Sequence, residues 1–206
     1  MDVVRIEPGD STFPAVSVDR LGDTAPSCLY AMGDTTILRN SLLGLVCSIQ
    51  CPGSIVIQTF DAIRALRDAG VVVIGGFHSP MERECLDILL RGNQPVILCP
   101  AKGLRSLRIG QNGRQALKEG RLLILSLFDE AVRRTTAAQA VRRNNLVAVL
   151  ANAVLVPHAV PRGKTWDTAL SALGRGQEVF TFSVEENSEI LETGAQSCAE
   201  LLKAAQ

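Results

Sequence analysis

A short strand, a glycine turn and a capped helix follow one another at residues 71–82, and this segment constrains the fold most. Val71-Val72-Val73-Ile74 is a β-branched run that suits a strand buried on both faces. The pair Gly75-Gly76 lets the backbone turn sharply and come close to a ligand. Ser79 can cap the next helix, with Pro80 at its first position and Glu82 at the spacing of a capping box. Free N–H groups at a helix start attract anions, so this segment predicts an anion site.

Strands and helices alternate along the chain from residue 42 onward. Such alternation builds βαβ units with right-handed crossovers. We therefore expect an α/β protein with a doubly wound, mostly parallel Rossmann-like sheet and helices on both faces. Residues 1–40 are rich in Pro and Gly and predict a loop-rich N-terminal arm before a Rossmann-like domain over 41–206. The predicted strands are 42–48, 71–74, 95–99, 122–125, 153–156 and 178–182, and the predicted helices are 54–69, 81–91, 112–119, 136–150, 165–173 and 188–204.

Composition excludes several classes of protein. The 206 residues carry 21 basic and 21 acidic side chains, which argues against a strongly basic nucleic-acid coat but allows a local patch. Aromatic residues make up only 4%, so a surface of stacked aromatic rings is not expected. No apolar run reaches the length of a membrane span, and the first residues lack the pattern of a signal peptide. We expect a cytoplasmic protein with no membrane association.

Six cysteines are scattered through the α/β pattern, so a disulfide framework is not expected. The spacing of Cys47 and Cys51 could begin a metal site, and Cys99 falls at a strand end near them. Zinc ligand pairs more often come with a second pair at similar spacing, and the chain has none. Buried reduced thiols are the favoured interpretation, and no metal site is predicted.

Polar groups and glycines follow several of the predicted strands. The carboxyl ends of parallel strands share one edge of a sheet, where such folds bind ligands. We expect these groups to converge around a phosphate-bearing ligand, and we predict no catalytic residue and no cofactor. The candidate binding residues are Ser48, Gly53 and Ser54, then Gly75, Gly76, His78 and Ser79, then Arg143, Asn144 and Asn145 on the helix 136–150, and finally Gly163, Lys164 and Thr165.

Each of these signals has a plainer alternative. Lys164 can meet a phosphate or lie solvated at a loop tip. His78 can act in acid–base chemistry or merely order its own loop. The run Arg142-Arg143-Asn144-Asn145 suits phosphate and base-edge contacts, or forms an ordinary solvated helix face. The nearby Arg133 and Arg134 favour a local anion site in a chain of zero net charge.

Several segments together resemble the DNA-processing protein A (DprA/Smf) family, within the SLOG superfamily of Rossmann-like domains. The resemblance covers roughly residues 15–183. It rests on Pro26-Ser27-Cys28-Leu29-Tyr30-Ala31-Met32-Gly33, similar to the family's P-x-x-L-Y-x-x-G, and on Arg142-Arg143-Asn144-Asn145-Leu146-Val147-Ala148-Val149-Leu150, similar to R-R-N-R-I-I-A-G-L. The segment Ile74-Gly75-Gly76-Phe77-His78-Ser79 stands where the family has S-G-x-A-x-G-I-D, and Cys47-Ser48-Ile49 stands in place of G-S-R.

The resemblance implies a function. The family binds single-stranded DNA through a basic pocket on this domain and hands it to a RecA-type recombinase. For this chain it implies binding of single-stranded DNA or a nucleotide, a RecA-type partner and a homodimer. It also implies a divergent branch without the C-terminal winged helix.

Two alternatives come from the same superfamily. The segment Pro161-Arg162-Gly163-Lys164-Thr165-Trp166-Asp167-Thr168 is similar to the P-G-G-x-G-T-x-x-E of LOG-type phosphoribohydrolases, although their glutamate falls on Thr168. A hydrolase would use His78, Glu82 or Asp167 as its acid or base. The other alternative is a nucleotide-sensing protein without catalysis. A DNA-binding or nucleotide-binding module is the leading hypothesis.

Overall fold

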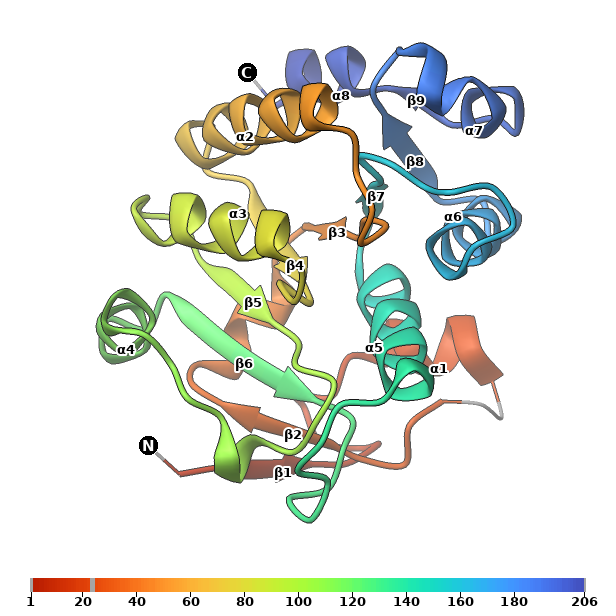
Figure 1. Cartoon of the computed structure of the whole chain (residues 1–206). Coiled ribbons are helices and arrows are strands. Elements are labelled where there is room, and N and C mark those ends of the chain that lie inside the picture. The colour runs from red at the N-terminus through yellow and green to blue at the C-terminus, as the bar shows by residue number, and fades with distance from the viewer. Residues whose placement is uncertain (1, 23–24, 206) are drawn as a thin grey trace.

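One sheet of nine strands runs through the part of the chain that the computed structural model describes, residues 2–22 and 25–205 (Figure 1). The strand order is β1-β2-β6-β5-β4-β3-β7-β8-β9. The seven strands from β6 to β9 in this order are parallel, whereas β2 is antiparallel to β6 and β1 is antiparallel to β2. The strands are β1 (Val4–Ile6), β2 (Leu29–Met32), β3 (Leu42–Leu45), β4 (Val72–Gly75), β5 (Val96–Leu98), β6 (Leu122–Ser126), β7 (Ala153–Leu155), β8 (Glu178–Thr181) and β9 (Gln196–Ser197).

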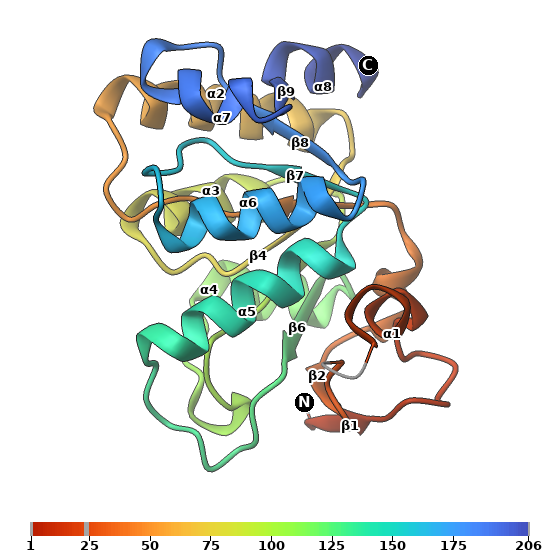
Figure 2. The same cartoon turned by 90° about the vertical axis from the view of Figure 1, so that its right-hand side faces the viewer.

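Helices cover both faces of the sheet (Figures 1 and 2). Helices α1, α5 and α6 pack together on one face, and α2, α3, α4 and α8 pack on the other. The prediction of a doubly wound, mostly parallel Rossmann-like fold is confirmed. The helices are α1 (Ala15–Leu21), α2 (Gly53–Asp68), α3 (Pro80–Leu90), α4 (Gln111–Lys118), α5 (Ala137–Leu150), α6 (Lys164–Gly174), α7 (Ser188–Glu192) and α8 (Cys198–Ala204), and 3₁₀ turns lie at η2 (Thr35–Arg39), η3 (Leu104–Ser106) and η4 (Glu185–Asn187).

The order of the strands fixes where a ligand can bind. From β3 the chain moves outward through β4, β5 and β6, then returns across the sheet to β7 and continues outward through β8 and β9. The direction of winding therefore reverses between β3 and β7. In open α/β sheets such a switch point leaves a crevice outside the carboxyl ends of the strands.

The N-terminal segment contributes to the same sheet. We predicted no strand before residue 42, and this prediction is wrong, because β1 and β2 extend the sheet beyond β6. Both strands are only three or four residues long and lie in a segment rich in Pro and Gly, yet they bury Ile6, Leu29 and Ala31. A domain boundary near residue 40 stays a prediction.

The C-terminal segment from residue 188 onward contains more elements than its sequence pattern predicts. The single helix predicted over 188–204 is interrupted, with α7, the short strand β9 and α8 in its place. Gly194 adopts φ +106°, a conformation that suits glycine and ends a helix. The freed chain then pairs β9 with β8.

Arg20 of α1 ties the N-terminal segment to α5. Its Nη1 donates to the carbonyls of Val149 and Ala151 at 2.6 Å each, at the C-terminal end of α5. A cation in this place donates to carbonyls that have no partner within the helix, and it interacts favourably with the negative end of the helix dipole. We expect Arg20→Met to lower the free energy of unfolding by about 1.5–3 kcal/mol, the range for hydrogen bonds to charged groups. Urea unfolding measures the change, and an equal loss in Arg39→Met, an exposed arginine, would contradict this explanation.

Tyr30 links β2 to the loop after β6. Its hydroxyl donates to Asp129 Oδ2 at 3.0 Å, and chiefly this hydrogen bond raises the pKa of Tyr30 to about 12. The neutral phenol is thus favoured in the folded state. The hydrogen bond of the neutral phenol therefore contributes to stability below pH about 10, and this contribution is lost as pH rises through 12. Because Tyr30 is the single tyrosine, tyrosinate absorbance reports this group alone. We expect Asp129→Ala to move the midpoint down toward 10, and an unchanged midpoint would contradict the assignment.

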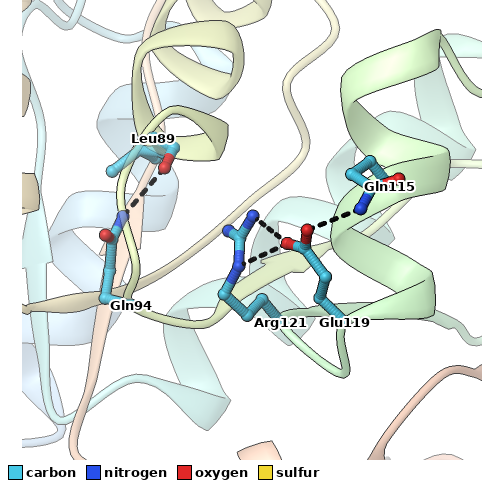
Figure 3. A network of polar contacts seen from close by, with 5 residues as sticks. All are labelled: Leu89, Gln94, Gln115, Glu119 and Arg121. Atoms are coloured by element: carbon cyan, nitrogen blue, oxygen red, sulfur yellow. Dashed lines mark hydrogen bonds and ion pairs between the residues drawn. The ribbon is translucent and has the colours of Figure 1, made fainter.

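A network of polar contacts lies at the opposite edge of the sheet, next to the starts of β5 and β6 (Figure 3). Gln94 donates to the carbonyl of Leu89 at 3.0 Å, and Glu119 accepts from both Arg121 and Gln115. These contacts join the end of α3 to the start of β5, and α4 to the start of β6.

Among residues 2–22 and 25–205, no helix combines the length and apolar character needed to cross a membrane.

Candidate functional site

A pocket of about 320 Å³ opens at the switch point between β3 and β7. We call it the switch-point pocket. Its walls come from the loop after β3, the start of α3, the first two turns of α5 and the start of α6. Its lining residues are Cys47, Ser48, Ile49, Gln50, His78, Ser79, Glu82, Ala137, Ala140, Val141, Arg143, Asn144, Val160, Lys164 and Thr165.

The start of α6 supplies anion-binding groups to this pocket. Gly163 is the N-cap, and no side chain caps the helix. The first turn therefore leaves N–H groups without an intrahelical acceptor, with Lys164 beside them. A Cβ on Gly163 would lie 2.9 Å from the carbonyl oxygen of Val160, so glycine permits this tight approach. Helix dipole, free N–H groups and a lysine together suit a phosphate.

Arg143 forms the floor of the pocket and is only 4% exposed. Its Nη1 donates to the carbonyl of Cys99 at 3.1 Å, while its buried Nε has no hydrogen-bond partner among the described residues. Burial lowers the pKa of the guanidinium, and the carboxylate of Glu82 partly opposes this effect. Burial and an unsatisfied donor make this guanidinium a candidate for binding an anion.

Gly76 makes room for that guanidinium. A Cβ at Gly76 would lie 1.4 Å from Nη1 and 1.9 Å from Cζ of Arg143, so the arginine lies directly against the glycine backbone. Every other amino acid would displace it. The glycine turn after β4 thus makes room for Arg143.

The start of α3 differs from the sequence prediction in one respect. The predicted capping box is confirmed, since Ser79 and Glu82 cap each other's backbone N–H groups. However, Glu82 Oε2 also accepts from the N–H of His78 at 3.1 Å. The carboxylate of Glu82 therefore takes the N–H groups of His78 and Ser79, two of the donors that the sequence offers to an anion here. Anion binding at this turn stays a prediction. The helix start without a side-chain cap lies across the pocket, at α6.

The structure brings about half of the predicted site residues together. Those lining the switch-point pocket are Ser48, His78, Ser79, Arg143, Asn144, Lys164 and Thr165. Gly76 lies under Arg143, and Gly163 caps α6. The remaining four lie outside the lining: Gly53 and Ser54 at the exposed start of α2, Gly75 within β4, and Asn145, which faces a neighbouring pocket beside Arg142.

Sequence reasoning missed the apolar rim of the pocket. Ile49 is 79% exposed and Val160 is 41% exposed at its mouth, although both are large apolar residues. Backbone strain could not be predicted either: Phe77 and Arg162 adopt φ 45° and 61°, the two non-glycine residues with positive φ among those described. Phe77 precedes the lining residue His78, and Arg162 precedes Gly163, the N-cap of α6. Strained residues often lie at functional sites.

The second histidine, His158, and the cysteines are the remaining candidate groups, and of these Cys47 lines the switch-point pocket. His158 is buried, and its Nδ1 lies 2.9 Å from Oδ1 of Asn187, which indicates a structural role. The thiol of Cys47 contacts that of Cys51, and this hydrogen bond with burial raises the pKa of Cys47. The six cysteines are free thiols, and the described residues contain no cluster of three or more metal ligands.

Fold and topology place this molecule among the Rossmann-like α/β proteins with a ligand crevice at the switch point. The sequence pattern of the DNA recombination-mediator protein A family matches residues 5–205, almost the whole chain. The chain belongs to this family. No curated protein sequence gives a significant match.

Solved structures agree with this assignment. DNA processing protein A from Streptococcus pneumoniae superposes with a TM-score of 0.81 at 19% identity, over 98% of this chain and 74% of that one. DNA processing protein A from Helicobacter pylori, described for its single-stranded DNA binding mode, gives 0.78 at 21% identity, over 99% and 95%. The molybdenum cofactor binding protein of Rippkaea orientalis is a more distant neighbour, with 0.57 at 12% identity over 81% and 97%. At these identities the likeness shows a shared fold.

Proposed function

We propose that the chain binds single-stranded DNA, with a phosphate in the switch-point pocket between Arg143 and the start of α6. The observation that carries this proposal is the buried Arg143 guanidinium with its unpartnered Nε. The uncapped α6 end and Lys164 add positive potential on the opposite wall. The family membership and the DNA-binding relative from Helicobacter pylori support the choice of nucleic acid as the ligand.

Hydrolysis of a nucleotide is less well supported. The position of the hydrolase glutamate falls on Thr168, which is buried and donates its hydroxyl to the carbonyl of Lys164 at 3.0 Å. Neither Thr168 nor Asp167 lines the pocket, and Glu82 is engaged in the cap of α3. Transfer of DNA to a RecA-type recombinase and assembly into a homodimer stay predictions from the family resemblance.

Fluorescence anisotropy with a labelled oligo(dT) of about 12 nucleotides tests the proposal. We expect the logarithm of the binding constant to fall linearly with the logarithm of salt concentration, with a slope of about −1.4 to −2 for two or three neutralised phosphates. A duplex of the same length should bind more weakly, because a pocket enclosed by the loop after β3 and by α3, α5 and α6 favours a single strand. Absence of binding at low salt would overturn the proposal.

A further inference from the structure

Two cysteine thiols meet at the wall of the switch-point pocket, on the loop between β3 and α2. Cys47 lines the pocket and is 6% exposed, whereas Cys51 is partly exposed to solvent. The chain bends at Ile49 and Gln50, and the thiol of Cys47 forms a hydrogen bond with that of Cys51. Both thiols are free, and the proposed phosphate site uses neither of them.

The two thiols differ in how readily they ionise. The hydrogen bond from Cys47 lowers the pKa of Cys51, and burial only partly opposes this effect. The same contact, together with burial, raises the pKa of Cys47. Cys51 also lies next to Pro52, the N-cap of α2, and no side chain caps this helix. The positive end of the helix dipole favours a thiolate in this place, so Cys51 is the better nucleophile of the pair.

The surroundings of Cys47 allow a bond between the two sulfurs. Its thiol hydrogen can be donated to Cys51 or to the carbonyl oxygen of His158, which lies 3.6 Å from Sγ. Loss of that hydrogen would leave the loop attached, because the N–H of Ser48 donates to the same carbonyl at 3.0 Å. The hydroxyl of Ser48 also accepts a backbone N–H from the loop after β7 at 3.0 Å. Movement on bond formation would therefore fall on the exposed part of the loop.

We propose that Cys47 and Cys51 form a reversible disulfide, with Cys51 as the attacking thiol and a small-molecule disulfide such as oxidised glutathione as the oxidant. The Cys51 thiolate attacks one sulfur of that disulfide, and the other sulfur leaves as a thiolate. Cys47 then loses its proton and attacks the Cys51 sulfur of the mixed disulfide, which releases the second small thiol. The chain thereby loses two hydrogen atoms, and the small disulfide is reduced to two thiols.

The other four cysteines differ from this pair. Cys85, Cys99 and Cys198 are at most 2% exposed, and burial raises the pKa of each thiol. Cys28 is partly exposed, as Cys51 is, but it precedes β2, and three strands separate β2 from β3 in the sheet. Cys28 is therefore the comparison thiol for a test.

Mass spectrometry tests the proposal on the full chain, which is held folded in oxidised glutathione, then denatured and alkylated. We expect the unmodified chain to keep four of its six thiols, with two hydrogen atoms lost from the peptide that holds Cys47 and Cys51. An excess of reduced glutathione should restore all six. In Cys47→Ala, Cys51 should retain one glutathione, because the second thiol is missing. In Cys51→Ala, the buried Cys47 should stay a free thiol.

Cys28→Ala is the matched control, and the disulfide should form in it as in the unmodified chain. Six free thiols in the oxidised unmodified chain, or a disulfide that joins other cysteines, would overturn the proposal. Equal addition of glutathione to Cys51 in Cys47→Ala and to Cys47 in Cys51→Ala would overturn it as well, because neither thiol would then be the preferred nucleophile. These measurements need no DNA, so failure of the disulfide and failure of the proposed function are distinguishable.

Discussion

Gly76→Ala is expected to weaken binding of single-stranded DNA by about 10- to 100-fold, although alanine adds only one methyl group. That methyl would overlap the guanidinium of Arg143, 1.4 Å from Nη1, so the arginine must leave its place on the glycine backbone. The ligand would then lose charge-assisted hydrogen bonds worth about 1.5–3 kcal/mol. Anisotropy titration of the folded variant measures this loss.

Gly53→Ala is the matched control for this substitution. Gly53 begins α2 at a helical φ, and a Cβ there meets no atom within 4 Å. Alanine favours the helix, so we expect unchanged or slightly higher stability and unchanged DNA affinity. The comparison also tests the sequence prediction that placed Gly53 in the binding site. Equal weakening in the two variants would contradict the role assigned to Gly76.

The sequence predicts the central fold well because that part is built from local patterns. Each predicted strand from residue 42 to residue 182 coincides with an observed strand, and the helices begin within a residue of their predicted starts. Buried β-branched runs such as that of β4 and caps such as Ser79 encode these elements in a few adjacent residues. Where short strands lie in a segment rich in Pro and Gly, as β1 and β2 do, the prediction failed.

The site was less predictable because it depends on contacts between distant segments. Topology placed Ser48, His78, Arg143 and Lys164 at one edge, and the structure gathers them around one pocket. Which donors are free depends on partners that a linear pattern does not specify. Glu82 illustrates this limit: the motif that predicted a cap also delivers a carboxylate to the N–H groups that an anion would have used.

Arg143→Met is expected to abolish most DNA binding, by about 100-fold, without lowering stability. The guanidinium is buried with one hydrogen bond and one unsatisfied donor. The hydrogen bond therefore offsets little of the free energy that is needed to remove the charge from water. Replacing an imperfectly paired buried charge by an apolar side chain of similar volume is often neutral or stabilising by about 1–4 kcal/mol. Glu82 would stay satisfied, because two N–H groups still donate to its carboxylate.

Arg142→Met removes the same charge from the adjacent position and serves as the comparison. Arg142 is exposed, its guanidinium lies 5.4 Å from the centre of the Phe128 ring, and it does not line the switch-point pocket. We expect its DNA affinity to fall less than threefold. Thermal unfolding and anisotropy on both variants separate the two roles of Arg143. A large loss of stability in Arg143→Met would show that this arginine is a structural residue. Retained stability together with lost DNA binding would show that the buried cation serves the ligand, although its Nε lacks a partner in the folded protein.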